Sequence, residues 1–169
     1  MATMDVPVKT KIGVQDNYSL GLNHISIHVR DVDEATGFWM DLFEAAPYRD
    51  FPGKRLFHVK LSGVVLAFFE QPGVIGRSVE FPHYAFTASP EGMRVLKKRL
   101  DDAGVKTHPL WTRNRTEALV YFRDPSGNLF ELYCPEYDRP EELQIGLGKT
   151  SGSTFRPPID DLLYDWPKP

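Results

Sequence analysis

The chain has 169 residues, of which 41% are hydrophobic and 25% charged, and its formal net charge is −3. This length and balance fit one globular domain and exclude two ordinary ones. The charge offers no basic surface for nucleic acid, and the longest apolar runs fall far short of the roughly 20 residues that span a bilayer. Residues 1–11 lack the apolar stretch of a signal peptide, and Cys134 has no partner for an internal disulfide. We therefore expect a cytoplasmic protein that binds neither nucleic acid nor membrane.

The first half of the chain has the pattern of a β-α-β-β-β unit, after a polar N-terminal arm at residues 1–20. Apolar residues alternate over 22–29, which predicts a strand, and they recur at helical spacing over 35–43, which predicts an amphipathic helix. Asp31 and Asp33 are candidate caps for that helix. The sequence then predicts three strands, near residues 47–50, 55–61 and 64–70, with Ser62-Gly63 as the hairpin turn between the last two.

The second half repeats the same order of elements. A strand is predicted at 83–87, and a helix starts at Ser89-Pro90 and ends before Gly104. Three more strands are predicted at residues 105–108, 118–122 and 129–134. The fold class is therefore α+β, built from two β-α-β-β-β modules at about residues 21–73 and 82–135. Residues 136–169 form a C-terminal tail that we expect to pack on the domain or on a partner subunit, because it carries Leu162, Leu163, Tyr164 and Trp166.

Three side chains that can bind a metal lie in predicted strands of this repeat, and two of them occupy equivalent places. His24 and His83 open the first strand of each half, and Glu131 lies in an apolar final strand, where an unpaired carboxylate would be costly. If a pseudo-twofold axis relates the halves, the two histidines converge on it. Two imidazoles and one carboxylate then form a facial set of ligands with open positions, which suits non-haem Fe(II) and also Mn, Co, Ni or Zn. A metal with exchangeable positions can polarise a bound oxygen.

Segments around these residues resemble the vicinal oxygen chelate superfamily, which includes glyoxalases, bleomycin resistance proteins and type I extradiol dioxygenases. The resemblance is carried by residues 22–26 (LNHIS), 83–86 (HYAF) and 121–132 (YFRDPSGNLFEL). It covers about residues 20–135 and implies a single domain with an open, cupped mixed sheet. It also implies that His24, His83 and Glu131 bind a divalent metal, with Fe(II) favoured, and that the chain forms a homodimer.

Other side chains are candidates for chemistry near that metal. Tyr121 lies ten residues before Glu131, across a turn, and is a candidate catalytic residue that hydrogen-bonds substrate oxygens, or else a core tyrosine. His28 shares the strand face of His24 and is a candidate acid or base, with a polar rim residue as the alternative. Ser26, His58 and Arg115 are candidate substrate-binding residues, the last within a basic cluster at residues 113–115. His108, before Pro109, is expected to be a surface turn residue.

The sequence is compatible with three classes of function. The tyrosine and the turn before Glu131 favour an extradiol-dioxygenase-like oxidoreductase that acts on a small, oxygen-chelating, catechol-like substrate. Thr112 and Arg113 stand where such enzymes have a histidine, which counts against ordinary catechol cleavage. The alternatives are a glyoxalase- or epimerase-like lyase or isomerase, and a small-molecule-binding resistance protein. A fosfomycin-type thiol transferase fits the three ligands but lacks the expected lysine and serine cluster before Tyr121.

Overall fold

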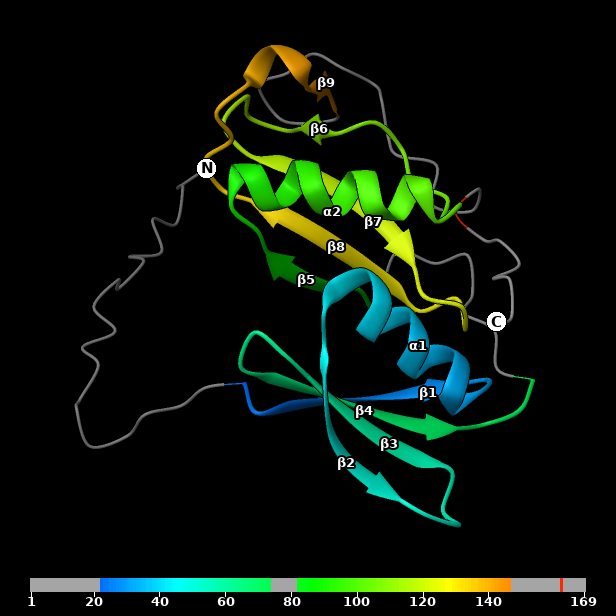
Figure 1. The fold of residues 1–169 in the computed structure, drawn as a ribbon. Helices are drawn as coiled ribbons and strands as arrows, with labels where there is room; N and C mark the ends of the chain where they lie inside the picture. Colours follow the sequence, from blue (N-terminus) through cyan, green and yellow to red (C-terminus); the bar gives the residue numbers. More distant parts are fainter. Residues whose placement is uncertain (1–21, 74–81, 147–161, 163–169) are drawn as a thin grey trace, which may run out of the picture.

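Two β-sheets and two helices make up the computed structural model, which describes residues 22–73, 82–146 and 162 (Figure 1). Sheet A contains four strands in the spatial order β1 (His24–Val29), β4 (Val64–Glu70), β3 (Leu56–Leu61) and β2 (Ala46–Phe51). Sheet B contains five, in the order β5 (Tyr84–Thr87), β8 (Leu129–Cys134), β7 (Ala118–Arg123), β6 (Trp111–Thr112) and β9 (Gln144–Ile145). The helices are α1 (Val32–Phe43) and α2 (Pro90–Asp102). The predicted α+β class with two β-α-β-β-β modules is confirmed.

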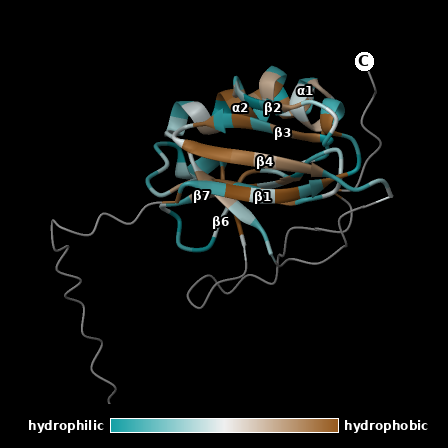
Figure 2. Cartoon of the chain, turned by 90° about the horizontal axis from the view of Figure 1, so that it is seen from below, coloured by the Kyte–Doolittle hydropathy of each residue, from teal (hydrophilic) through white to brown (hydrophobic). Residues whose placement is uncertain are grey.

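Each module pairs its first and last strands in parallel and the remaining strands antiparallel. β1 runs parallel to β4, and β5 runs parallel to β8. The central strand β4 is hydrophobic along most of its length in Figure 2, as expected for a strand paired on both sides. β1 and β5 lie at the edges of their sheets. The two predicted histidine positions are thus each at the start of an edge strand.

Both helices begin at the caps that the sequence predicts. The side chain of Asp31 accepts a hydrogen bond from the backbone N–H of Glu34 at 3.0 Å. Ser89 Oγ accepts one from the N–H of Gly92 at 3.1 Å, and Pro90 occupies the first turn of α2. Each cap satisfies an N–H group that the helix itself leaves without a partner.

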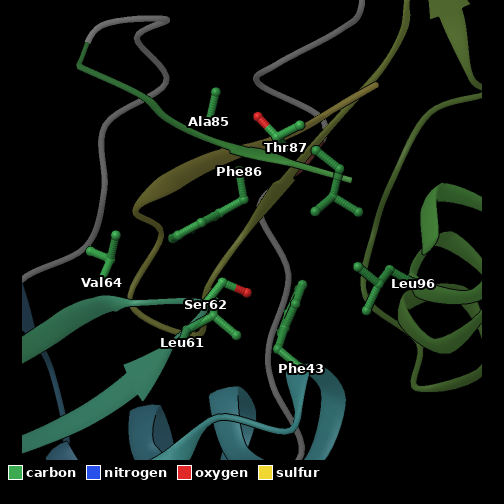
Figure 3. A pocket seen from close by; sticks show the side chains of 9 residues that line it. Phe43, Leu61, Ser62, Val64, Ala85, Phe86, Thr87 and Leu96 are labelled. Atoms are coloured by element: carbon green, nitrogen blue, oxygen red, sulfur yellow. The ribbon is translucent and has the colours of Figure 1, made fainter. Parts of the chain in front are cut away.

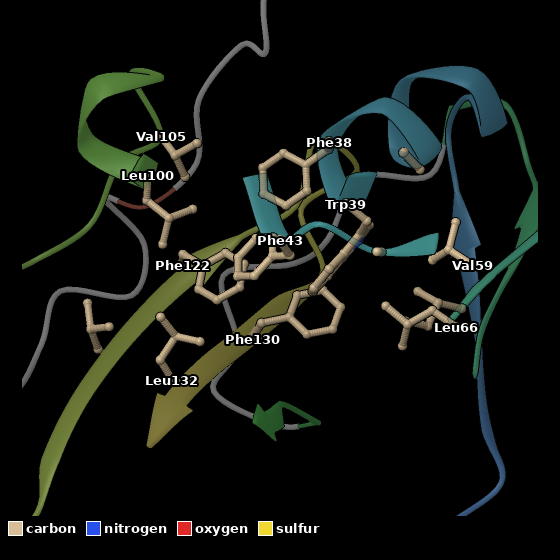
Figure 4. Packing of buried hydrophobic residues seen from close by; sticks show 14 of the residues in the cluster. Phe38, Trp39, Phe43, Val59, Leu66, Leu100, Val105, Phe122, Phe130 and Leu132 are labelled. Carbon is tan, nitrogen blue, oxygen red and sulfur yellow. The ribbon is translucent and has the colours of Figure 1, made fainter. Parts of the chain in front are cut away.

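Helix α1 joins the two sheets into one hydrophobic core. Phe38 and Trp39 are fully buried, and Phe43 is 8% exposed. The ring of Trp39 lies 4.7 Å from that of Phe130 on β8, and the ring of Phe43 lies 5.2 Å from that of Phe122 on β7. Figure 4 shows these α1 side chains between residues of sheet A and residues of sheet B. The helix-covered faces of the two sheets therefore pack into one core, and the opposite face of each sheet is left for other contacts.

A turn of the second module is also hydrogen-bonded to the first module. Ser126 Oγ accepts from the backbone N–H of Arg30 at 2.9 Å, and Asn128 Nδ2 donates to the carbonyl of His28 at 3.0 Å. Asp124 holds this turn together by accepting from the N–H groups of Ser126 and Asn128. Burial raises the pKa of Asp124 to about 6. The turn between β7 and β8 is thus tied to the end of β1.

The structure corrects two parts of the sequence interpretation. Residues 105–108 form no strand; the short strand β6 comes later, at Trp111–Thr112, because Pro109 has no N–H for a sheet ladder. Beyond residue 135, a 3-10 helix (Pro140–Glu142) leads into β9, which pairs in parallel with β6 and so extends sheet B. The predicted arm at residues 1–20 lies outside the described residues. Of the part of the chain that is described, no helix is long and apolar enough to cross a membrane.

Candidate functional site

The outer face of sheet B brings together three of the predicted site residues. Tyr121 on β7 stands opposite Glu131 on β8, and Ala85 on β5 flanks Glu131 on the other side. His83 directly precedes β5, and its Nε2 lies 3.1 Å from Oε2 of Glu131. The rings of His83 and Tyr121 are 5.4 Å apart in an edge-to-face arrangement. The alternation of side chains along β8 explains why Glu131 is on this face while Phe130 and Leu132 are in the core.

The carboxylate of Glu131 is held in a buried, polar environment. It is 4% exposed, and burial raises its pKa, while the nearby charges of His83 and Arg113 lower it. An imidazole nitrogen and a carboxylate oxygen in contact are a donor pair that divalent first-row metals accept. Two of the three predicted ligands therefore lie where one metal ion fits both.

Arg113 supplies positive charge beside this pair. Its guanidinium lies 4.8 Å above the ring of Trp111, and Nη2 is 3.4 Å from the hydroxyl of Tyr121. Nη1 is 3.8 Å from a carboxylate oxygen of Glu117, whose other oxygen accepts from the hydroxyl of Tyr133 at 2.9 Å. A planar guanidinium stacked on an aromatic ring keeps its outer N–H groups directed to one side, which suits an anionic ligand.

Four of the remaining predicted residues lie on sheet A. His24, Ser26 and His28 alternate along β1 and are exposed. Ser26 and His58 are both in register with Ala67 of β4, so they share one sheet face with His24. The pKa of His58 is lowered by partial burial and by the charges of Arg49 and His24. This outer face of sheet A thus carries a group of histidines separate from His83.

The three predicted ligands therefore do not converge within one chain. No cluster of three His, Cys, Asp or Glu side chains that could hold a metal is found in residues 22–73, 82–146 and 162. The sequence expects His24 and His83 to converge if a pseudo-twofold axis relates the halves; their shared metal site stays a prediction, although in one chain the two histidines lie on different sheets. The physical reason is that the two sheets pack through their helix-covered faces, which leaves β1 at the edge of one sheet and Glu131 in the other.

Arg115 and His108 also lie near the site. Arg115 is exposed, and among the described residues its one hydrogen bond is from its backbone N–H to Thr112 Oγ1, so its substrate-binding role stays a prediction. Arg113 of the same basic cluster reaches Tyr121. His108 is not a surface residue but is 4% exposed. Its Nε2 accepts a hydrogen bond from the backbone N–H of Tyr121 at 3.0 Å. A single histidine before a proline gives no periodic signal, so its burial could not be foreseen from pattern alone.

An apolar cluster surrounds Tyr121 on the same face. It contains one residue of the predicted tail, Leu162, which is 2% exposed. The other members come from strands of sheet B: Trp111, Leu119, Tyr121 and Leu129, with Tyr133 packed against them. At Leu162, the predicted tail therefore contacts the sheet face that carries Glu131.

A separate cavity of about 470 Å³ lies where the two modules meet (Figure 3). Phe43 from α1, Leu61 from β3 and Phe86 from β5 line it, together with Leu96 from α2 and Leu132 from β8. Its described lining contains no histidine and no carboxylate. The cavity therefore has none of the groups that bind metal or move protons, and the candidate site is the face with His83 and Glu131.

Comparison with known proteins agrees with this arrangement of strands. The family model for the Glyoxalase/Bleomycin resistance protein/Dioxygenase superfamily matches residues 21–132, which include both modules except the last residues of β8. The chain belongs to this superfamily. The vicinal oxygen chelate resemblance that the sequence suggests is thereby confirmed.

The relatives that this chain resembles include proteins named as a metallothiol transferase, a glutathione transferase and a fosfomycin resistance protein. Metallothiol transferase FosB of Bacillus licheniformis is 30% identical over 78% of this chain and 86% of its own length. Glutathione transferase FosA of Serratia marcescens is 31% identical over 66% of this chain and 79% of its own. A crystal structure of the fosfomycin resistance protein FosX from Listeria monocytogenes matches with a TM-score of 0.61 and 25% identity, over 73% of this chain and 97% of that one. Another FosX structure, of a variant, was solved with Mn(II) and 1S,2S-dihydroxypropylphosphonic acid.

Proposed function

We propose that the chain is a metal-dependent enzyme that adds a nucleophile, a thiol or water, to the epoxide of a small phosphonate such as fosfomycin. The observation that carries this proposal is the His83–Glu131 pair, at 3.1 Å, beside the Tyr121 hydroxyl and the Arg113 guanidinium. A site with one metal-ligand pair and one stacked arginine matches a substrate that has a reactive oxygen and an anionic group. The relatives named for thiol transfer and fosfomycin resistance support the same reaction class.

The metal would be held by His83 and Glu131, with His24 as the third ligand. Mn(II) is the first candidate, in place of the Fe(II) that the dioxygenase interpretation favoured, because a FosX structure holds Mn(II). Nitrogen and carboxylate ligands suit Mn(II) as well as the other first-row ions. When bound, such an ion supplies the positive charge that polarises a substrate oxygen.

The side chains of the chain itself have separate tasks in this proposal. Arg113 binds the phosphonate through its outer N–H groups and excludes neutral substrates. The hydroxyl of Tyr121, 3.4 Å from Arg113 Nη2, donates a hydrogen bond to the oxygen on which negative charge develops as the epoxide opens. Apolar neighbours such as Leu129 and Leu162 exclude water from the ring that reacts.

A second copy of the chain would complete the site. His24 is exposed on the outer face of sheet A, and His83 with Glu131 lies on the outer face of sheet B, so two copies can bring one His24 to each pair. Ser26, His28 and His58 would then line the same shared site. This is the homodimer that we propose.

A reaction assay tests the chemistry. Protein loaded with Mn(II) is mixed with fosfomycin and glutathione, cysteine or water alone, and ³¹P NMR follows the phosphonate. We expect a new phosphonate signal that depends on the metal and on one of these nucleophiles. Oxygen uptake on a catechol panel with Fe(II), and an unchanged fosfomycin spectrum with every nucleophile, would instead support the dioxygenase alternative.

Subunit complementation tests the shared site. His24→Ala and Glu131→Ala are each expected to abolish the reaction. After the two variants are mixed and allowed to exchange subunits, half of the dimers are mixed and each has one intact site, so about a quarter of the wild-type activity returns. Two His24→Ala preparations mixed together are the control and should stay inactive. Failure of the mixed sample to regain activity, with exchange verified, contradicts a site shared between copies.

A further inference from the structure

Both ring nitrogens of His108, a residue next to the candidate site, are hydrogen-bonded. Nδ1 lies 2.8 Å from the carbonyl oxygen of Pro109, and Nε2 lies 3.0 Å from the backbone nitrogen of Tyr121. A carbonyl oxygen only accepts and a backbone N–H only donates, so the proton must be on Nδ1. The imidazole is therefore neutral in a single tautomer, and burial lowers its pKa to about 4.

The imidazole takes the place of a missing strand partner. The ladder between β6 and β7 has one register pair, Trp111 with Leu119, and Tyr121 lies two residues farther along β7. At that point the N–H of Tyr121 donates to His108 in place of a carbonyl of β6. A buried N–H without an acceptor would be costly, so this bond fixes the backbone at Tyr121.

The phenol ring of Tyr121 is also held between two imidazoles. The ring of His108 lies 5.7 Å from it at 76°, and the ring of His83 lies 5.4 Å from it at 70°. Trp111 contacts it at 6.1 Å. The hydroxyl at the end of this ring is the atom that lies 3.4 Å from Arg113 Nη2. The position of that hydroxyl therefore depends on the ring contact with His108 as well as on the ring contact with the predicted ligand His83.

We propose that His108 is a positioning residue, which fixes the backbone and the ring of Tyr121 so that the phenol hydroxyl stands beside Arg113 and the His83–Glu131 pair. This proposal rests on the proposed function, in which the Tyr121 hydroxyl contacts the substrate. His108 itself holds no proton toward the site, because its one N–H is bonded to Pro109. Glutamine can provide an acceptor and a donor of similar reach, whereas alanine provides neither.

A double-mutant cycle with Tyr121 tests this role. In the wild-type background, His108→Ala should lower kcat at least tenfold, while His108→Gln keeps it within about threefold. In the Tyr121→Phe background, where the hydroxyl is absent, His108→Ala should lower kcat by less than twofold further, because both changes remove the same contribution. Mn(II) affinity should stay within about twofold throughout. An equal loss in both backgrounds would mean that His108 acts on folding alone and overturns the proposal.

A second measurement needs no substrate. The ionisation of the Tyr121 hydroxyl is read by difference absorbance against Tyr121→Phe, and it should shift in His108→Ala but not in His108→Gln. The ¹⁵N spectrum of wild type should show Nε2 of His108 unprotonated between pH 5 and 8. An unshifted Tyr121 titration in His108→Ala would overturn the positioning role, even if the epoxide assay succeeds. If instead the wild type does not act on fosfomycin while both of these results are obtained, the proposed function fails and the positioning role stands.

Discussion

Nε2 of His83 and Oε2 of Glu131 lie 3.1 Å apart on a sheet face where the glutamate is 4% exposed. A buried carboxylate needs a partner of opposite charge, and a divalent ion between these two atoms would meet that need more fully than a histidine alone.

Replacement of Glu131 by Gln should therefore weaken metal binding strongly. The amide keeps the shape but removes the charge, and the loss of Mn(II) affinity should exceed about 100-fold, beyond the 10- to 100-fold that an outer-shell change costs. Calorimetric titration with Mn(II) measures it. Glu117→Gln is the matched control, because Glu117 is buried to a similar degree on the same face but contacts Tyr133 and Arg113. Equal Mn(II) affinity of wild type and Glu131→Gln would remove Glu131 from the ligand set.

Arg113→Gln should raise KM for fosfomycin more than it lowers kcat. A hydrogen bond to a charged group contributes about 1.5–3 kcal/mol, which corresponds to about a 10- to 100-fold change in KM. Steady-state kinetics provide the value. Arg115→Gln is the control from the same loop, since that side chain is exposed, and its KM should stay within about twofold. If the two variants have the same KM, the anion-binding role of Arg113 is wrong.

Leu162→Ala should destabilise the protein although Leu162 lies far beyond the residues that match the superfamily. This side chain is 2% exposed in the cluster around Tyr121, and truncation of a buried leucine costs about 2–5 kcal/mol. The free energy of unfolding in urea tests it. Val95→Ala is the control, because Val95 is 43% exposed on α2 and its truncation should change stability by less than about 0.5 kcal/mol. A change as small as that of Val95→Ala would show that Leu162 is not packed there in solution.

The pH dependence of stability should reveal two buried groups that act in opposite directions. The pKa of His108 falls from 6.5 to about 4 on folding, so the unfolded chain binds the extra proton and stability is lost as pH falls from 6.5 to 4. The pKa of Asp124 rises from 3.8 to about 6, so the folded chain binds the extra proton and stability is gained as pH falls from 6 to 3.8. Between pH 6 and 4 the two contributions largely offset each other in the wild type.

His108→Gln should remove the contribution of His108 to the pH dependence and leave that of Asp124. Relative to wild type, the variant should gain on the order of 3 kcal/mol in unfolding free energy between pH 7 and pH 4, the equivalent of the His108 shift. Urea unfolding at several pH values between these limits measures the difference. Val95→Ala, which changes no titratable group, should run parallel to wild type over the same range. If the curve of His108→Gln runs parallel to that of wild type, the pKa of His108 does not change on folding.

The elements with local signals were predictable from the sequence. Asp31 and Ser89 start helices because their side chains cap the backbone nearby, and the alternation around Glu131 fixes which face of β8 it occupies. What the sequence could not reveal depends on packing between distant segments. The separation of His24 from His83 results from how the sheets share a core through α1, and the burial of His108 results from a gap in the β6–β7 ladder. Neither arrangement leaves a periodic pattern in the residues themselves.

The hydrogen bonds from Arg30 to Ser126 and from Asn128 to the carbonyl of His28 tie the strand of His24 to the strand of Glu131. In the proposed dimer, these two strands of one chain serve different sites. A ligand that displaces Glu131 in the first site would therefore also shift His24 in the second site. Occupancy of the two sites should then be cooperative, and Asn128→Ala, which removes one of the two hydrogen bonds, should weaken the coupling, so that the Hill coefficient of a Mn(II) titration moves toward one.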